Sequence, residues 1–217
     1  MTSPTGMVFD PECRRCPRLS AHLLKLRKTL PAHYHNAPVA PFGDPNPTII
    51  IVGLAPGTHG ANATGRPFTG DHAGLLLYET LHEVGLANQA TATSQDDGLK
   101  LLGCRITNAV KCLPPENKPT GQEVNTCNAF LRAELAESGD SPVIVALGTI
   151  AHKAILKALE LKQSDYKFAH NALFELPDGR SLLDSYHCSR YNTQTGRLTA
   201  AMFRAVLARA VEVAGGG

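Results

Sequence analysis

Short runs of β-branched and aliphatic residues constrain the fold of this 217-residue chain more than any other feature. Residues 48–52 and 142–147 are almost wholly apolar, and residues 104–111 are typical of a further strand. Runs of this kind are typical of strands that are buried on both faces of a parallel sheet. A hydrophobic content of 43% is enough to build one buried core around them.

Segments with helical periodicity separate these runs. Leucines recur at steps of three and four through residues 19–30, and we predict further helices over residues 74–85, 120–137, 149–161 and 199–213. Glu123 lies three residues after Thr120, which predicts a capping box at the start of the third of these helices. Residues 174–183 are typical of a hairpin that turns at Asp178-Gly179, and residues 31–47, with five prolines, form an irregular crossing segment.

Strands that alternate with helices predict an α/β fold. We expect one domain over residues 1–217, with a mainly parallel four-stranded sheet between two layers of helices and a frayed end at residues 215–217. In such sheets ligands bind at the carboxyl ends of the strands. The loops after Val52, after Thr107 and around His187 are therefore the places to search for a site.

The charge of the chain is only +2, so composition alone does not indicate a nucleic-acid partner. Residues 10–28 hold six basic and two acidic residues, and Arg190, Arg197, Arg204 and Arg209 form a second basic cluster. Such clusters can attract phosphates or can simply be solvated surface. No segment is apolar enough to cross a membrane, and residues 1–11 do not resemble a signal peptide. We expect a cytoplasmic protein.

Six cysteines in a protein of this kind favour metal ligation or buried thiols over disulfides. Cys13 and Cys16 form a C-x-x-C pair, and Cys112 and Cys127 are separated by fourteen residues. Four thiolates suit zinc and a [4Fe–4S] cluster equally well, and a redox-active or merely buried pair is the alternative. Cys104 lies in a predicted strand, where it would be a small hydrophobe.

Three further segments hold residues that could bind a ligand or act on it. Residues 53–57, Gly-Leu-Ala-Pro-Gly, permit a turn close to a ligand, although many strand ends have similar loops. Residues 65–71 include Phe68, which can stack on a base or lie in the core, and Asp71, which can act on a ligand or cap a helix. His187 is followed by hydrogen-bonding side chains that suit a phosphate, or it is a structural histidine.

The combination of these motifs is more specific than any one of them. Cys-x-x-Cys, Gly-Leu-Ala-Pro-Gly, Gly-Arg-Pro-Phe, Thr-Asn-Ala-Val-Lys-Cys and His-x-Ser-Arg-x-Asn occur in this order between Cys13 and Arg204. Together they resemble the uracil-DNA glycosylase superfamily, and within it the iron–sulfur family 5 (class b) of bacteria and archaea. The resemblance implies a monofunctional enzyme of base excision repair that removes uracil, and other deaminated bases such as hypoxanthine, from DNA.

The resemblance also implies roles for individual residues. His187 would face uracil O2 as a catalytic residue, Asn108 would read the edge of the base, and Phe68 would stack on it. Ser189 and Asn192 would bind flanking phosphates, and Arg190 would contact the position in the duplex that the extruded base has left. The backbone on the sugar side would come from Gly53, Ala55, Pro56 and Gly57.

This chain departs from the wider superfamily at two places. Leu54 and Ala55 provide no polar group to position water, a role that family 5 gives to an aspartate after Gly-Arg-Pro-Phe, here Asp71. The same carboxylate could instead stabilise the sugar cation. Cys188 replaces the usual proline after His187, which leaves the rigidity of that loop open.

The cysteines Cys13, Cys16, Cys112 and Cys127 match the cluster ligands of family 5, so the resemblance favours a structural [4Fe–4S] cluster that binds residues 10–30. We expect a monomer that acts on DNA and not on a membrane. The alternatives are an iron–sulfur module that binds DNA lesions without turnover and a zinc-dependent nucleotide hydrolase.

Overall fold

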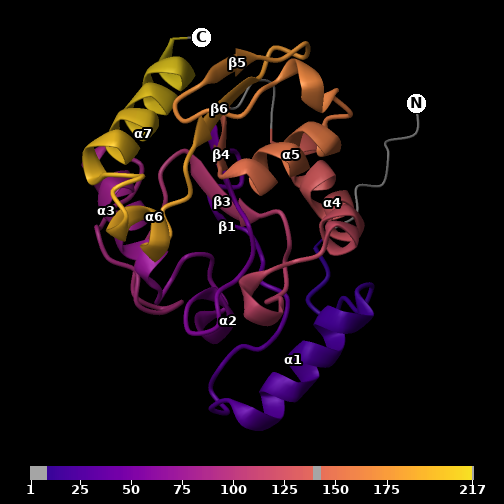
Figure 1. Cartoon of the computed structure of the whole chain (residues 1–217). Helices are drawn as coiled ribbons and strands as arrows, with labels where there is room; N and C mark the ends of the chain where they lie inside the picture. The colour runs from indigo at the N-terminus through magenta and orange to yellow at the C-terminus, as the bar shows by residue number, and fades with distance from the viewer. Residues whose placement is uncertain (1–8, 139–142, 217) are drawn as a thin grey trace.

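The computed structural model describes residues 9–138 and 143–216 and shows an α/β fold (Figure 1). One sheet has the strand order β1-β3-β2-β4-β6-β5. Its four central strands run parallel to one another. They are β2 (Ile49–Gly53), β3 (Cys104–Asn108), β4 (Val143–Leu147) and β6 (Ser181–Ser185). The predicted apolar runs therefore form the centre of the sheet.

The prediction of four strands was wrong, because the sheet has six. The additional strands are the antiparallel edges β1 (Phe42–Gly43) and β5 (Leu173–Glu175). β1 is two residues long and lies within the proline-rich segment, so it has no alternation to detect. β5 and β6 form the predicted hairpin, in which Leu173 pairs with Leu183.

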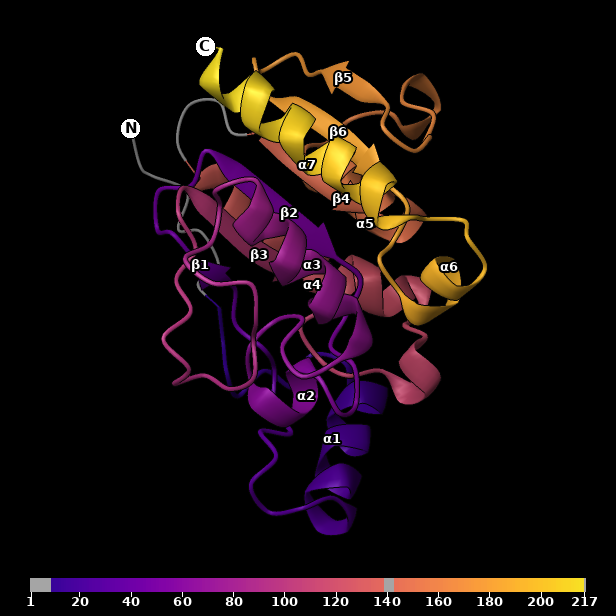
Figure 2. The ribbon, with the colours of Figure 1, turned by 90° about the vertical axis from the view of Figure 1, so that its left-hand side faces the viewer.

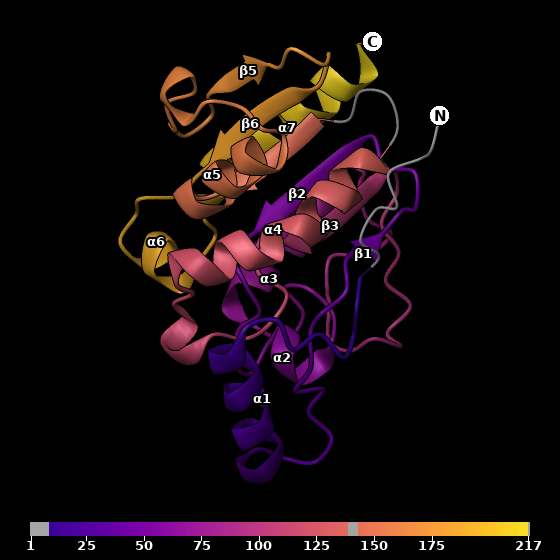
Figure 3. The same ribbon diagram turned by 90° about the vertical axis from the view of Figure 1, so that its right-hand side faces the viewer.

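Helices cover both faces of the sheet, as predicted. α3 (His72–Glu83) and α7 (Ala200–Gly215) pack on one face, and α4 (Gly121–Ala136) and α5 (Thr149–Ala158) pack on the other (Figures 2 and 3). Neighbouring residues of β2 point to opposite layers: Ile51 belongs to the core under α3 and α7, and Val52 to the core under α4 and α5. This explains why the strand has no polar face.

α1 (Pro17–Thr29) lies outside the two helical layers, below the carboxyl ends of the strands (Figure 1). Its Leu19 and Leu23 pack in a third apolar cluster with residues that follow β3 and residues of α4. Arg18 donates to Glu123 over 2.7 Å, and Glu123 also completes the predicted capping box with Thr120. One carboxylate thus joins the start of α4 to α1.

Four short elements were not predicted: α2 (Ala61–Thr64), α6 (Arg190–Gln194) and the 3-10 turns η1 (Pro115–Asn117) and η2 (Gln163–Asp165). Gly215, predicted to be frayed, ends α7, and Gly216 caps it. Pro142, residues 1–8 and Gly217, on which parts of the sequence predictions fall, lie outside the described residues. Within the described ranges, no helix has the length and apolarity needed to cross a membrane.

Candidate functional site

A cavity of about 770 Å³ opens where the central strands end. It is lined by segments that follow β2, β3, β4 and β6, including all three loops predicted from the sequence. Eight of the predicted site residues line it: Ala55, Gly57, Phe68, Asp71, Asn108, His187, Ser189 and Arg190. Residues that are far apart in the sequence therefore meet in one place.

Asn108 is the last residue of β3 and pairs in register with Gly53, the last residue of β2. The Asn108 side chain is buried, and its Oδ1 has no hydrogen-bond partner among the described residues. A Cβ atom at Gly53 would lie 2.4 Å from this Oδ1 and 2.6 Å from Cζ of Phe68. Gly53 does not line the cavity itself, but only a glycine leaves space there for both side chains.

Phe68 lies in the loop between α2 and α3, with a left-handed backbone (φ +55°) that is uncommon for a bulky residue. Its ring is buried and stacks with the ring of His187 at a centroid distance of 5.9 Å and an interplanar angle of 29°. A Cβ atom at Gly74 would lie 1.6 Å from the Phe68 carbonyl oxygen. Gly74, in the first turn of α3, therefore leaves the space that the Phe68 carbonyl group occupies.

His187 follows β6, and its Nδ1 is buried without a hydrogen-bond partner in the described part of the chain. Burial lowers the pKa of His187 to about 4, so the imidazole is neutral at pH 7. The Asn192 amide donates to the His187 carbonyl oxygen over 2.8 Å and fixes the loop. A neutral imidazole has one N–H to donate and one nitrogen that can accept.

Asp71 caps a helix, which is one of the two functions considered for it from the sequence, and it also lines the cavity. Its Oδ1 caps α3 by accepting from the Gly74 N–H over 2.9 Å. Its Oδ2 faces the cavity loop, where a Cβ atom at Gly60 would lie only 2.4 Å away. Burial raises the pKa of Asp71, and hydrogen bonds from the Gly74 and Ala73 N–H groups partly oppose the increase.

The remaining predicted residues differ in their positions. Ser189 lines the cavity and caps α6 by accepting from the Asn192 N–H, and Arg190 lines the cavity with an exposed side chain. Asn192 and Pro56 do not line it; Pro56 is buried, and the Asn192 amide is directed to the His187 carbonyl oxygen. Asn192 therefore supports the loop.

Sequence reasoning missed several residues of the cavity wall. Gly148, Thr149 and Ile150 form the start of α5. The Gly148 N–H donates to the Ser185 carbonyl oxygen over 2.8 Å, and the N–H groups of the first turn of a helix generally suit an anion. A glycine directly after a buried strand was the available signal, and Gly148 indeed has a left-handed φ of +93°. His59 and His72 also line the wall, and nothing in their sequence context distinguished them from the other histidines.

The four cysteines predicted to bind metal line a second, smaller cavity between α1 and the segment after β3. Burial raises the pKa of Cys112 to about 12 and that of Cys127 to about 11. The Lys111 N–H donates to Cys127 Sγ over 3.3 Å, which is a contact that stabilises a thiolate. Cys104 and Cys188 are fully buried elsewhere, Cys104 as the small hydrophobe that was predicted.

Among the described residues, no group of three or more His, Cys, Asp or Glu side chains converges closely enough to hold one metal ion. Zinc sites require four ligands at about 2.0–2.3 Å from one centre. In a [4Fe–4S] cluster each thiolate binds a different iron, so the sulfur atoms surround a larger volume. Four thiols line this cavity, which is the number of ligands that a [4Fe–4S] cluster takes.

Comparison with known proteins agrees with this geometry. Residues 40–210 match the family model described as the uracil DNA glycosylase superfamily. A type-5 uracil-DNA glycosylase of Thermus thermophilus is 48% identical over 207 residues, which cover 94% of both chains. A type-5 uracil-DNA glycosylase of Pyrobaculum aerophilum is 42% identical over 94% of this chain and 89% of its own.

A type-4 uracil-DNA glycosylase of Thermotoga maritima is 39% identical, but over only 50% of this chain and 49% of its own. The similarity to the type-5 proteins thus extends over nearly the whole chain, whereas this similarity to a type-4 protein is partial. The chain belongs to the type-5 family of the uracil DNA glycosylase superfamily.

Proposed function

We propose that this protein is a monofunctional DNA glycosylase that hydrolyses the N-glycosidic bond of uracil in DNA and leaves an abasic site for base excision repair. The observation that carries the proposal is the single cavity that brings Phe68, Asn108, His187 and Asp71 together. The names of the type-5 relatives agree with it. Hypoxanthine and other deaminated bases are proposed as further substrates.

The base has to leave the duplex before the bond can be reached, at a cost of a few kcal/mol. The Phe68 ring offers a stacking surface for the extruded base. The Asn108 Oδ1 is a buried acceptor without a partner, and such a group gains most from a ligand N–H. With Oδ1 accepting from uracil N3–H, the amide nitrogen can donate to O4.

His187 is proposed to stabilise the base as it departs with negative charge. Because its pKa is about 4, the residue is a neutral donor and needs no proton uptake at pH 7. An N–H aimed at a developing oxyanion in a dry pocket is worth about 3 kcal/mol of transition-state stabilisation. Asn192 holds the His187 backbone in place for this contact.

Asp71 is proposed to act on the sugar side of the bond, by orienting the attacking water or by stabilising the oxocarbenium ion. Its Oδ1 accepts from the Gly74 N–H, and its Oδ2 faces the glycines of the cavity loop. No lysine occurs among the described residues that line the cavity, so the Schiff-base route to strand cleavage has no amine there. The product is therefore an intact strand with an abasic site.

The rim of the cavity suits the DNA backbone. Arg190 is exposed beside Ser189, and the start of α5 also lines the cavity. These groups would bind the phosphates next to the extruded nucleotide. We propose that a monomer, in the cytoplasm of a bacterium or archaeon and in contact with its nucleoid, carries out the reaction.

A [4Fe–4S] cluster is proposed to link residues 10–30 to the segment after β3. Its ligands would be Cys13, Cys16, Cys112 and Cys127. The cluster supplies a structural link, since hydrolysis of the bond needs no electron. Analysis of the purified protein should find about four irons and four sulfides per chain. Zinc in place of iron and sulfide would contradict the proposal.

The proposed activity is tested by incubating a small amount of protein with excess uracil-containing duplex and measuring free uracil. The expected result is many uracils released per protein, with strand breaks appearing only after alkali. Release limited to one equivalent, or tight retention without release, would instead indicate the lesion-binding module. Parallel duplexes with hypoxanthine test the wider substrate range.

A further inference from the structure

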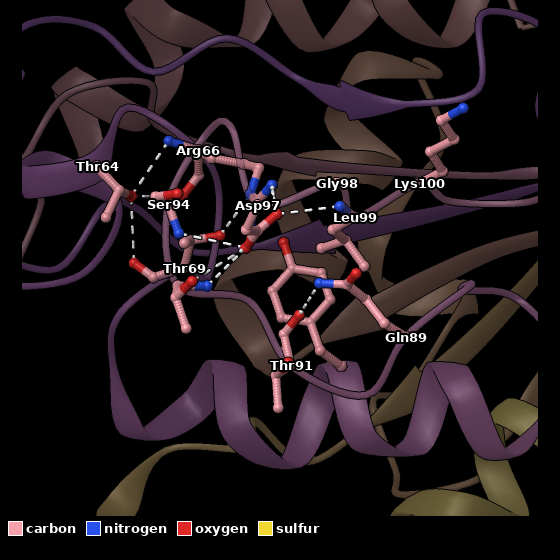
Figure 4. Close-up of polar contacts among 12 residues, drawn as sticks. Thr64, Arg66, Thr69, Gln89, Thr91, Ser94, Asp97, Gly98, Leu99 and Lys100 are labelled. Carbon is pink, nitrogen blue, oxygen red and sulfur yellow. Dashed lines mark hydrogen bonds and ion pairs between the residues drawn. The ribbon is translucent and has the colours of Figure 1, made fainter.

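Arg66 belongs to the Gly-Arg-Pro-Phe motif but does not line the cavity. Its side chain is only 3% exposed, and it forms a bidentate ion pair with Asp97, as Figure 4 shows. Nη1 donates to Oδ1 over 2.9 Å, and Nη2 donates to Oδ2 over 2.6 Å. The guanidinium also lies over the Phe42 ring, 4.9 Å from its centroid. A buried pair of this geometry holds two segments in one arrangement.

Asp97 is itself fixed by its own loop. Its carboxylate accepts from the Thr93 N–H over 2.7 Å. It also accepts from the N–H groups of Ser94 and Leu99 over 3.2 and 3.0 Å (Figure 4). The Arg66 guanidinium holds the pKa of Asp97 well below its usual range, so the carboxylate is ionised at all working pH values. The Asp97 carboxylate is therefore held in a fixed position, and its ion pair with Arg66 ties residues 65–71 to the Asp97 loop.

On the other side of the pair, Arg66 fixes the short loop that carries Phe68. Its Nε donates to Thr69 Oγ1 over 2.8 Å. The Thr64 hydroxyl lies within hydrogen-bond distance of the carbonyl oxygens of Arg66 and Thr69. The Tyr78 hydroxyl donates to the Pro67 carbonyl oxygen over 2.6 Å. Side chains thus hold the backbone immediately before and after Phe68.

Phe68 needs this support, because a left-handed backbone is unfavourable for a bulky residue and persists only where surrounding contacts impose it. We propose that Asp97, acting through Arg66, is a positioning residue that holds Phe68 against the extruded base. The inference rests on the proposed function, because it assigns a role within the same site. Neither Arg66 nor Asp97 is among the residues that line the cavity.

A double-mutant cycle on uracil release separates positioning from a general loss of stability. Asp97→Asn removes the charge that Arg66 needs, and we expect it to lower the single-turnover rate about tenfold, since small misplacements of reacting groups are costly. In a Phe68→Ala background the same change should lower the rate less than about twofold, because the group being positioned is gone. Equal losses in both backgrounds would overturn the proposal.

Asp178→Asn is the matched control, because Asp178 also pairs with an arginine, Arg180, but in the β5–β6 turn. It should leave the rate unchanged. If Asp97→Asn does not fold, Arg66→Lys replaces it in the cycle, because lysine keeps the positive charge but cannot form the bidentate ion pair. The same two outcomes, non-additive or additive losses, decide the question.

Hydrogen exchange of the free protein gives a readout that does not depend on catalysis. Asp97→Asn should speed exchange in residues 64–71 and leave α7 protected as in the unchanged protein. Unchanged exchange in residues 64–71 would overturn the positioning role. If the unchanged protein releases no uracil, the proposed function is refuted. If Asp97→Asn still speeds exchange in residues 64–71, the support of Phe68 by Arg66 and Asp97 stands on its own.

Discussion

Gly60 determines the space available to the Asp71 carboxylate. A Cβ atom there would lie 2.4 Å from Oδ2, whereas one at Gly57 would lie 3.3 Å from the same oxygen. We therefore predict that Gly60→Ala displaces Asp71 and lowers uracil release at least about tenfold, because catalytic geometry tolerates little displacement. Gly57→Ala is the control and should have a much smaller effect. Single-turnover rates of both variants check the prediction, and equal losses would contradict it.

The His187 imidazole, whose Nδ1 is buried, makes the stability of the protein depend on pH. In the unfolded chain a histidine takes up a proton below about pH 6.5, whereas folded His187 does so only near its pKa of about 4. The unfolded state therefore binds more protons between these values, and the free energy of unfolding falls as the pH is lowered. We predict that His187→Phe loses less stability than the unchanged protein between pH 7 and pH 5. Denaturant unfolding at both pH values tests this, and equal losses would contradict it.

Individual site residues were predictable where a motif fixed their position. Phe68, Asp71, Asn108 and His187 all line the predicted cavity. The sequence did not show that Asn192 would bind the His187 backbone, or that Arg66 would pair with Asp97. Both contacts join residues through the folding of loops, and loop geometry has no periodic signal in a sequence.

Among the structural elements, the most predictable were those with a clear pattern. β2 and β4 follow from apolar runs, and α4 begins where the Thr120 capping box places it. The edge strands β1 and β5 are too short for alternation to be recognised. α2 and α6 have four and five residues, so tertiary contacts and caps stabilise them rather than helix propensity.

α1 packs on the sheet domain through one apolar cluster, the Arg18–Glu123 pair and the cysteine cavity. If these cysteines hold a cluster, its removal breaks the link between the half-buried Cys13 and Cys16 and the buried Cys112 and Cys127. We predict faster hydrogen exchange in residues 13–30 of the cluster-free protein, with α7 unchanged. Cluster removal by a chelator under oxidising conditions, followed by exchange measurements, checks this. Equal protection of α1 before and after removal would show that the cysteines do not pin it.

The molecule as a whole assembles its site from four strand ends. Residues near positions 55, 70, 108, 148 and 187 meet only because β3, β2, β4 and β6 run parallel and side by side. The general rule for parallel sheets predicted the edge at which they meet. The number of strands and the volume of the cavity required the complete tertiary structure, because they depend on the packing of all layers together.

Asp71 is proposed to act on the glycosidic bond from within this cavity. Asp71→Asn tests it well, because asparagine is as good a helix cap as aspartate and should preserve α3. Single-turnover release from one uracil-containing duplex should fall at least about a hundredfold, while the affinity for the duplex stays nearly the same. Release of uracil by this variant at the rate of the unchanged protein would exclude Asp71 from the reaction.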